Sequence, residues 1–500
     1  MRMDAPAKAK PEAAQASQPA SLYAAHVKVY PARVQGRFRY AKWVFLVVSL
    51  GVYYLLPWLR WHRPGEASDQ FLLIDLAVQR FYLGPIVIWQ DELYFVTGLL
   101  IISAVALFLV TSLFGRVWCG YACPQTVWTD LYLWVERRIE GDRNARMRLD
   151  QGARNAAYWR RKVLKHTAWL AIAAATGGAF VLYFGDAPTM LRDIVTGQAG
   201  SWTYSFLGIL TFTTYALAGW AREQVCTYMC PWPRFQGAML DENSLIVTYR
   251  AWRGEPRGKH KQGESWEGQG DCVDCRQCVN VCPTGIDIRD GQQLECIGCG
   301  LCIDACDAIM DKVGRPRGLI ALDTLAHMQK AETACAALTP GPARQVAGDA
   351  ATADRRIIRP RTLIYAGVLA AVCLVMLGAF MMRSTTELAV LRDRAPVYIL
   401  LSDGSVRNAF TVKVWNKGYE EPRYALGVEG LPGATVAVVG VPHEAAEIPT
   451  RADGVATHRV HVTAPAGARL PESTRLRFVL TDETGREVVS HDSVFLAPRR

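Results

Sequence analysis

Eight of the fourteen cysteines in this chain lie in two short runs with the same spacing. Residues 271–288 read DCVDCRQCVNVCPTGIDI, and residues 294–310 read LECIGCGLCIDACDAIM. Each run has the spacing CxxCxxCxxxC, in which closely placed thiolates can ligate iron. Cysteines grouped in this way favour metal ligation over a secreted disulfide framework, so we expect them to face a reducing compartment.

The spacing of each run predicts ligation of cubane iron-sulfur clusters. Three cysteines of a run can reach three corners of one cluster, while the fourth turns away and ligates the other. We therefore expect two [4Fe-4S] clusters, one held by Cys272, Cys275, Cys278 and Cys306, the other by Cys296, Cys299, Cys302 and Cys282. Structural zinc is the alternative, but zinc ribbons typically separate their CxxC pairs by a longer loop. One departure is that Asp307 stands where the first run has Pro283.

A second cysteine pattern occurs twice, as GRVWCGYACPQTVW (115–128) and REQVCTYMCPWPRF (222–235). Its cysteines keep a constant offset, since 226 − 119 = 107 and 230 − 123 = 107. This repeat predicts that Cys119, Cys123, Cys226 and Cys230 come together in a pseudo-symmetric bundle. Their thiolates suit Cu(I), another cluster or a redox dithiol, and simple packing of small side chains is the alternative. We expect Arg116 and Arg222 to favour the thiolate form.

These motifs lie within a predicted membrane frame. Five apolar runs are long enough to cross a bilayer as helices, namely 43–59, 94–114, 167–184, 202–221 and 362–382. The apolar stretch 71–89 contains Asp75, Arg80 and a Gly-Pro break, so we expect it at the interface. Ten basic residues lie at 116–162, between the second and third spans, and three lie at 60–93, in the loop before the second span. The positive-inside rule then places the cysteine-rich runs in the cytoplasm and the C-terminal segment in the periplasm.

The predicted fold class is a multi-domain membrane protein. Its parts are an all-α transmembrane bundle of about five spans, a bacterial two-cluster ferredoxin-like α+β insert and a C-terminal all-β immunoglobulin-like sandwich of about seven strands. The expected boundaries are a disordered tail at 1–40, a four-span bundle with the two CxxxCP motifs at 41–240, the ferredoxin-like domain at 241–310 with its core at 266–310, a linker at 311–361, a fifth span at 362–382 and the sandwich at 383–500. The net charge of +10 is explained by the membrane topology, and we expect no nucleic-acid partner.

The order of these motifs resembles the FixG/CcoG/RdxA family, accessory proteins for assembly of cbb3-type cytochrome c oxidase. The resemblance covers nearly the whole chain and implies a bacterial inner-membrane oxidoreductase that converts Cu(II) to Cu(I). It also implies the two ligand sets given above and matches Cys119, Cys123, Cys226 and Cys230 to the family's CxxxCP positions, as a copper or redox site. Implied partners are the lipid bilayer, oxidase subunits or copper-handling proteins, and an electron donor that the sequence does not identify.

Two other functions remain open for the same frame. One is a NapH-like conduit that takes electrons from membrane quinol to a soluble partner, with the four CxxxCP cysteines holding another redox centre or bracing the bundle. The other is a non-enzymatic assembly scaffold whose clusters are structural. Copper dependence distinguishes the reductase from the conduit, and redox-active clusters with an accessible partner distinguish both from the scaffold.

Overall fold

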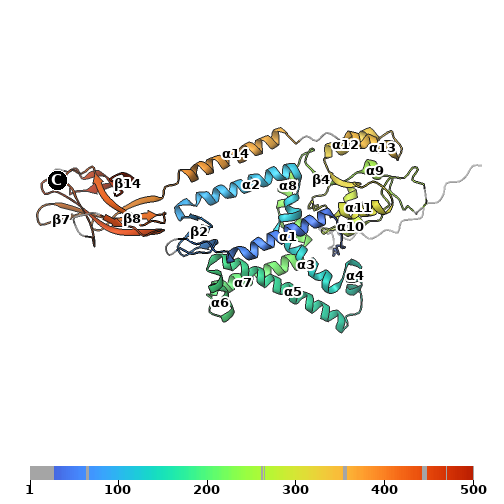
Figure 1. Ribbon diagram of the computed structural model, residues 1–500, viewed down its shortest axis with the longest axis horizontal. Helices are drawn as coiled ribbons and strands as arrows, with labels where there is room; N and C mark the ends of the chain where they lie inside the picture. Colours follow the sequence, from blue (N-terminus) through green and yellow to red (C-terminus); the bar gives the residue numbers. More distant parts are fainter. Residues whose placement is uncertain are drawn as a thin grey trace, which may run out of the picture.

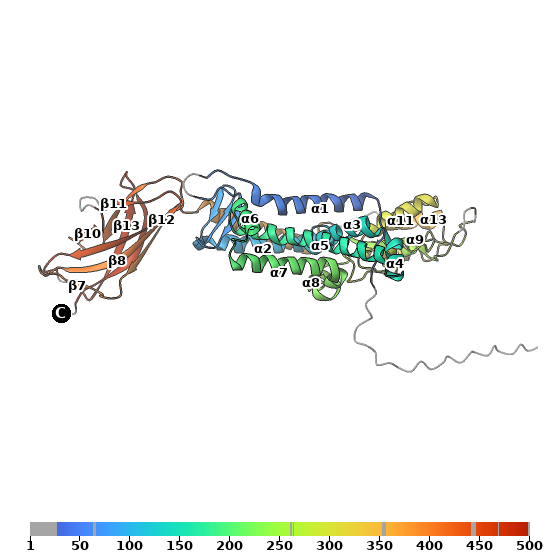
Figure 2. The same ribbon diagram turned by 90° about the horizontal axis from the view of Figure 1, so that it is seen from below.

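The computed structural model describes residues 28–63, 67–260, 263, 265–352, 357–441, 447–468 and 470–498. The molecule is elongated, with long helices in its middle part (Figure 1). A compact region with α11, α12 and α13 lies at one end of these helices, and a β-sandwich lies at the other. The view from below shows the long helices running along the same axis (Figure 2).

The middle part is built from long apolar helices joined by shorter amphipathic ones. The long helices are α1 (Arg37–Leu55), α2 (Tyr94–Phe114), α5 (Ala156–Val181), α7 (Ser201–Thr214) and α14 (Pro360–Met381). The shorter helices are α3 (Pro124–Glu140), α4 (Arg143–Gln151), α6 (Ala187–Thr196) and α8 (Trp232–Met239). Within the described residues, four helices are long and apolar enough to cross a membrane: Arg37–Trp58, Gln90–Phe114, Ala156–Phe184 and Pro360–Met381.

The span expected at 202–221 differs from these four. It is helical, but α7 ends at Thr214 and continues as a π-helical segment, Tyr215–Ala221. Its threonines, serine and tyrosines lower its hydropathy, and it packs along α5.

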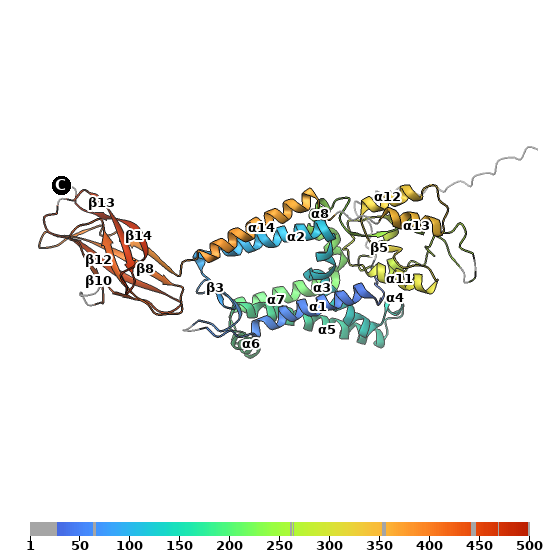
Figure 3. The same ribbon diagram turned by 45° about the horizontal axis from the view of Figure 1, so that its top comes forward.

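The helix bundle expected at residues 41–240 also includes α14, which comes from outside that range. Helix α2 packs along α14, which comes from the far end of the chain, whereas α5 packs along α7. Figure 3 shows α2 beside α14, and α1 with α5 and α7 as a second group. Apolar spans carry little sequence information about their neighbours, since lipid and another helix solvate them equally well.

The segment 71–89, expected at the interface, forms a small antiparallel sheet at the sandwich end of the helices. Its strands are β1 (Leu72–Asp75), β2 (Arg80–Leu83) and β3 (Ile86–Ile88). Asp75 pairs directly with Arg80 across the first hairpin, so opposite charges lie side by side where the strands turn.

The sandwich contains two antiparallel sheets, as expected, but nine strands rather than seven among the described residues. One sheet has the order β10 (Thr435–Val438), β12 (Gly454–Ala464), β8 (Val406–Asn416), β6 (Thr386–Arg392), with β7 (Ile399–Leu400) also paired to β8. The other has the order β11 (Glu447–Pro449), β9 (Arg423–Glu429), β13 (Ser473–Thr481), β14 (Glu487–Leu496). Phe410 and Phe478 meet edge to face at 5.0 Å between the sheets. The shortest strands are β7 and β11, which have only two and three residues.

The segment 311–361, expected to be a linker, is largely folded. Strand β5 (Ile320–Asp323) pairs antiparallel with β4 (Ile246–Tyr249), and helices α12 (Leu325–Cys335) and α13 (Pro342–Ala351) pack together. Short helix α9 (Ala251–Gly254) contacts both of these helices, and Trp252 is buried between them. The cluster-bearing region therefore extends beyond the predicted boundary of 310.

The expectation of a disordered tail at 1–40 is wrong for the part that the structure describes, which begins at Lys28. Residues 1–27 lie outside the described residues. From Lys28 the chain is fixed: the Ala32 N–H donates to the Asn280 carbonyl, and Lys28 forms an ion pair with Asp150. Asp304 then caps α1 by accepting from the N–H groups of Phe38 and Arg39.

Candidate metal-cluster and cysteine sites

The structure gathers Cys272, Cys275, Cys278 and Cys306 around one small cavity. The first three come from the loop around the short helix α10 (Gln277–Asn280), and Cys306 comes from α11 (Leu301–Lys312). Strands β4 and β5 cover this site, with Tyr249 and Ile320 lining the cavity. The four thiols expected to hold the first cluster are therefore brought together in an apolar environment.

Cys296, Cys299, Cys302 and Cys282 form a second group. Cys282 and Cys296 both act electrostatically on Cys299 and on Cys302, which places the four thiols near one another. Val281, Ile297 and Leu301 pack around this group. The structure thus reproduces the crossing that the spacing predicts, with the last cysteine of each run lying near the other group.

Both groups have the chemistry that a cubane cluster needs. Within the described residues, no three Cys, His, Asp or Glu side chains converge closely enough to hold a single metal ion. A cluster of several iron and sulfur atoms requires its four thiolates to be farther apart than one ion does. Burial raises the pKa of Cys278 to about 11 and that of Cys306 to about 12, so these thiols stay protonated until metal replaces the proton.

Two aspartates fix the chain around the first group. Asp307, in the place of a proline, accepts a hydrogen bond from the Gly318 N–H at 2.9 Å and holds the turn that leads to β5. Buried Asp271 forms ion pairs with Arg253 and Arg315. The departure at Asp307 therefore stabilises the return of the chain.

The two CxxxCP motifs have the same backbone conformation. Each first cysteine lies in a π-helical turn, Trp118–Ala122 for Cys119 and Val225–Met229 for Cys226. Each second cysteine is extended, and its N–H donates to a carbonyl five residues earlier, at 2.9 Å for Cys123 and 2.7 Å for Cys230. A helix then begins at or just after the proline. The repeat seen in the sequence is thus a structural repeat.

The four CxxxCP cysteines lie close together and beside the second cluster group. Cys119 is within electrostatic reach of the other three. Gly120 touches the second run: a Cβ at this position would lie 3.0 Å from the Ile297 carbonyl oxygen and 3.1 Å from the Cys299 Cα. Glycine is therefore needed for this approach, and it brings the membrane motif against the loop that carries Cys299.

Two further contacts hold the same junction. The Tyr121 hydroxyl donates to the Cys299 carbonyl at 3.0 Å, and Arg116 Nη1 donates to the Cys296 carbonyl at 2.8 Å. Gln236 on α8 lies between Arg116 and Cys119, with its Oε1 3.0 Å from the Cys119 Sγ. Gln236 lies outside both motifs, on a helix that only the fold brings near Cys119, so no signal in the sequence identifies it.

The expectation that Arg116 and Arg222 favour thiolates is wrong for the metal-free protein. Burial raises the pKa of Cys119 to about 12 and that of Cys226 to about 11, although Arg116 acts in the opposite direction. Arg222 is directed elsewhere, to Glu136, with its Nη2 3.1 Å from the carboxylate. Desolvation of a thiolate outweighs the attraction of one nearby guanidinium here.

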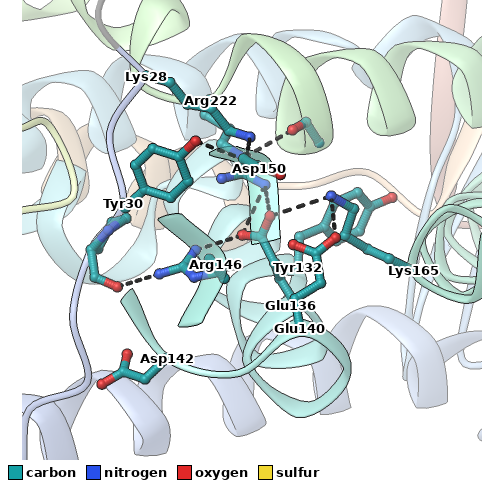
Figure 4. A network of polar contacts seen from close by, with 12 residues as sticks. Lys28, Tyr30, Tyr132, Glu136, Glu140, Asp142, Arg146, Asp150, Lys165 and Arg222 are labelled. Carbon is teal, nitrogen blue, oxygen red and sulfur yellow. Dashed lines mark hydrogen bonds and ion pairs between the residues drawn. The ribbon is translucent and has the colours of Figure 1, made fainter. Parts of the chain in front are cut away.

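A buried charge network lies on the other side of Arg222 (Figure 4). Glu136 accepts from Arg146 at 2.8 Å and from Arg222, and Lys165 lies 3.5 Å away. Burial alone would raise the pKa of Glu136, but the three cations outweigh it and lower this pKa to about 2. The network ties α3, α4 and α5 to the segment that precedes Cys226.

Two cysteines lie apart from these groups, and the first of them is Cys335. It is fully buried between α12 and α13, and its Sγ lies 3.2 Å from the Arg344 carbonyl. Cys373 is exposed on α14.

Three family models match the chain in the regions described above. Residues 221–324 match a 4Fe-4S dicluster domain, residues 96–141 match a 4Fe-4S binding domain, and residues 376–498 match the IG-like fold at the C-terminal of FixG. The second match includes Cys119 and Cys123, so a membrane CxxxCP motif also lies in a segment of iron-sulfur type.

Curated relatives extend over nearly the whole chain. The chain is 49% identical to the nitrogen fixation protein FixG of Rhizobium meliloti, covering 95% of this chain and 94% of that protein. It is 48% identical to protein RdxB of Cereibacter sphaeroides, over 96% of this chain and 98% of the relative. A methylamine utilization ferredoxin-type protein, MauN of Methylorubrum extorquens, is 26% identical over 50% of this chain and 77% of its own length.

Proposed function

This chain belongs to the FixG/RdxA family of membrane-associated iron-sulfur electron-transfer proteins, and we propose that it is a cupric reductase. Its substrate would be Cu(II), and its product Cu(I) would serve assembly of a cbb3-type cytochrome c oxidase. The reduction consumes one electron for each copper ion, and it requires no acid or base catalysis.

The observation that carries this proposal is the contact between the CxxxCP motif and the second cysteine run. Gly120 and Tyr121 lie directly against the Cys299 backbone, so the junction is continuous protein without an intervening solvent layer. Thiol sulfurs prefer Cu(I) to Cu(II), so copper that meets thiols of the group Cys119, Cys123, Cys226 and Cys230, without needing all four as ligands, gains affinity as it is reduced.

We assign one ligand set to each of the two cysteine groups that the fold brings together. Cys272, Cys275, Cys278 and Cys306 would hold one [4Fe-4S] cluster, and Cys296, Cys299, Cys302 and Cys282 the other. When bound, such clusters pass single electrons at low potential. Cys275 is the exposed member of the first group, which makes this end the entry side for an electron donor.

The thiols of the CxxxCP motifs also set the proton balance. Because burial keeps Cys119 and Cys226 protonated without metal, binding of Cu(I) releases their protons. Buried Gln236 accepts a hydrogen bond from the Cys119 thiol in the metal-free state, and this bond is lost when the proton leaves.

The proposed location is a bacterial inner membrane. The sandwich and the cluster region lie at opposite ends of the long helices (Figure 1), an arrangement that supports their location on opposite sides of a bilayer. The basic loop between α2 and α5 favours a cytoplasmic cluster region and a periplasmic sandwich. The sandwich would then face oxidase subunits or copper-handling proteins.

An anaerobic single-turnover experiment tests the proposal. The purified protein is reduced, excess reductant is removed, and Cu(II) is added while cluster absorbance and chelator-trapped Cu(I) are followed together. We expect Cu(I) to appear in step with cluster reoxidation. Reduced clusters that do not respond to Cu(II) would reject the reductase.

A pair of cysteine variants tests the site. Cys230→Ser should abolish Cu(I) formation and leave both clusters intact by iron and sulfide content. Cys373→Ser, which changes an exposed cysteine on α14, should behave as the wild type. Full activity of Cys230→Ser would remove the CxxxCP cysteines from the proposal.

A second candidate is a quinol-linked electron conduit, favoured by a pocket beside the second cluster group. This pocket has a volume of about 390 Å³ and is lined by Cys296 and by apolar side chains that include Phe114, Leu240 and Leu294. Phe114 ends the α2 span, so the pocket lies at the membrane end of the cluster region. Cluster reduction by a quinol analogue, with no oxidation by Cu(II), would favour the conduit.

A further inference from the structure

An arginine-lined pocket lies where α1 begins, apart from all of the cysteines. It has a volume of about 520 Å³ and is formed by the chain before α1, by α1 itself, by α3 and by the turn into α4. Four arginines line it: Arg33, Arg39, Arg137 and Arg138. Three aromatic side chains complete the wall: Tyr40, Trp43 and Trp134. Neither the electron path nor the copper site uses any of these residues.

The charges of this pocket are not balanced within the described chain. Asp130 is shared by Arg39, at 3.1 Å, and Lys42, at 3.0 Å. The carboxylate that lines the pocket is Asp142, which Figure 4 shows apart from the Glu136 network and which accepts from the Arg33 N–H. The four lining arginines therefore face one lining carboxylate, which leaves an excess of three positive charges, and the adjacent pair of Lys42 and Asp130 does not change this balance.

Two guanidinium groups also have unmet hydrogen-bonding capacity. Arg39 is only 6% exposed, yet its Nη2 has no hydrogen-bond partner among the described residues, and the same holds for the buried Nε of Arg137. Burial and the nearby Arg39 lower the pKa of Arg137 to about 10. A buried donor without an acceptor costs free energy, so an anion that accepts from both groups would stabilise the pocket.

The surroundings indicate where this anion comes from. Arg39 lies 4.5 Å from the Trp43 ring centroid and Arg138 lies 5.3 Å from that of Trp134. Tyr40 is 72% exposed, and Phe45 and Val47 of α1 expose apolar surface directly beyond it. Tryptophan and tyrosine concentrate at the headgroup level of bilayers, with arginine on the cytoplasmic side. The pocket therefore opens at the level of lipid headgroups.

We propose that this pocket binds the phosphate group of an anionic phospholipid. Arg39 and Arg137 donate to the phosphate oxygens, Arg33 and Arg138 supply further positive charge, and Trp43 and Trp134 contact the glycerol and upper acyl chain. The bound lipid would fix the start of α1 against α3. Inorganic phosphate offers the same charge without the apolar part, so it should bind more weakly.

Native mass spectrometry of the full-length holoprotein tests this site. The protein is titrated with phosphatidylglycerol or phosphatidylcholine of equal chain length, and separately with inorganic phosphate. We expect preferential retention of phosphatidylglycerol, lowered about tenfold or more in the double variant Arg137→Gln/Arg138→Gln, since each juxtamembrane basic residue contributes about 1 kcal/mol. Arg148→Gln, on the same basic loop but outside the pocket, should retain the lipid as the wild type does.

Three outcomes would overturn the proposal. They are equal retention of the two lipids, an unchanged preference in the double variant, and displacement of phosphatidylglycerol by equimolar inorganic phosphate. If the double variant fails to fold, the wild type decides: a photoreactive phosphatidylglycerol should crosslink to peptides from residues 33–43 and 134–142. Crosslinks found only on other helices would reject the site.

Discussion

The Tyr121 hydroxyl donates a hydrogen bond to the carbonyl of Cys299 at 3.0 Å. This bond joins a residue between two CxxxCP cysteines to a residue of the second cysteine run, 178 positions later. Tyr121 is buried, whereas Tyr228, its counterpart in the second motif, is 58% exposed. The two CxxxCP motifs therefore differ in their contacts, and the tyrosine of the first motif is the one that contacts the cluster region.

Tyr121→Phe should weaken this contact while leaving the ring in place. We expect the free energy of unfolding of the holoprotein to fall by about 1 kcal/mol, the usual net contribution of one hydrogen bond. Thermal unfolding in detergent measures it, and Tyr228→Phe is the matched control with no expected change. Equal effects of both variants would contradict a special role for the Tyr121 bond.

Gly120→Ala should push the first CxxxCP motif away from the second cysteine run. Its Cβ would meet backbone atoms at 3.0 to 3.2 Å, and backbone cannot move aside as a flexible side chain can. We expect a lower melting temperature and slower Cu(II)-dependent cluster reoxidation in stopped-flow absorbance. Gly208→Ala on α7 is the control, because nothing lies within 4 Å of its added Cβ. Unchanged reoxidation in Gly120→Ala would show that the electron path does not need this contact.

Glu136→Gln should strongly destabilise the protein, because it leaves Arg146, Lys165 and Arg222 around a neutral side chain. We expect a loss of about 3 kcal/mol or more at pH 7, typical of a broken buried ion pair. Exposed Glu429→Gln should have little effect. Thermal unfolding of the purified proteins gives both values, and a wild-type melting temperature for Glu136→Gln would contradict the importance of the network.

The pH dependence of this effect follows from the direction of the pKa shift. The pKa of Glu136 is about 2 in the folded protein against an ordinary value of 4.5. Its contribution is therefore complete above about pH 4.5 and is lost as the pH falls toward 2. The difference in stability between the wild type and Glu136→Gln should shrink over this window. A constant difference down to pH 3 would contradict the assigned shift.

Lys417→Met should loosen the sandwich from the small sheet. Lys417 Nζ lies 2.5 Å from Asp91, 3.0 Å from Glu92 and 2.6 Å from Glu387, and its side chain is 1% exposed. We expect faster hydrogen–deuterium exchange in residues 72–92 and unchanged cluster content. Lys413→Met, on strand β8 just before Lys417, is the control. Unchanged exchange in Lys417→Met would show that other contacts hold this junction.

Much of the candidate site could be predicted from the sequence because cysteine spacing constrains ligand geometry directly. The grouping of Cys306 with Cys272 and of Cys282 with Cys296 follows from that spacing, as does the CxxxCP repeat. Helix pairing could not be predicted, because the apolar surfaces of α2 and α14 look alike to lipid and to protein. The folded segment after α11 could not be predicted because β5 forms only by pairing with β4, which lies before both cysteine runs in the chain.

The protonation state of the CxxxCP thiols could not be predicted from the sequence either. Arg116 and Arg222 are adjacent to the motifs in sequence, which favours thiolates, but the fold directs Arg222 to Glu136. Burial of Cys119 depends on contacts with residues more than a hundred positions away, such as Gln236. Sequence proximity is therefore a poor guide to which charge a thiol meets.

The pairing of β4 with β5 bears on how this protein is organised as a set of parts. Ile246 pairs with Asp323 and Tyr249 with Ile320, so the chain enters and leaves the cysteine-rich region at neighbouring points. Segments whose ends adjoin can be inserted into a host protein with little disturbance. The cluster region is therefore one continuous insertion between two adjoining points, and a ferredoxin unit grafted there would have to keep the contacts that Cys296, Cys299 and Asp304 make with the membrane helices.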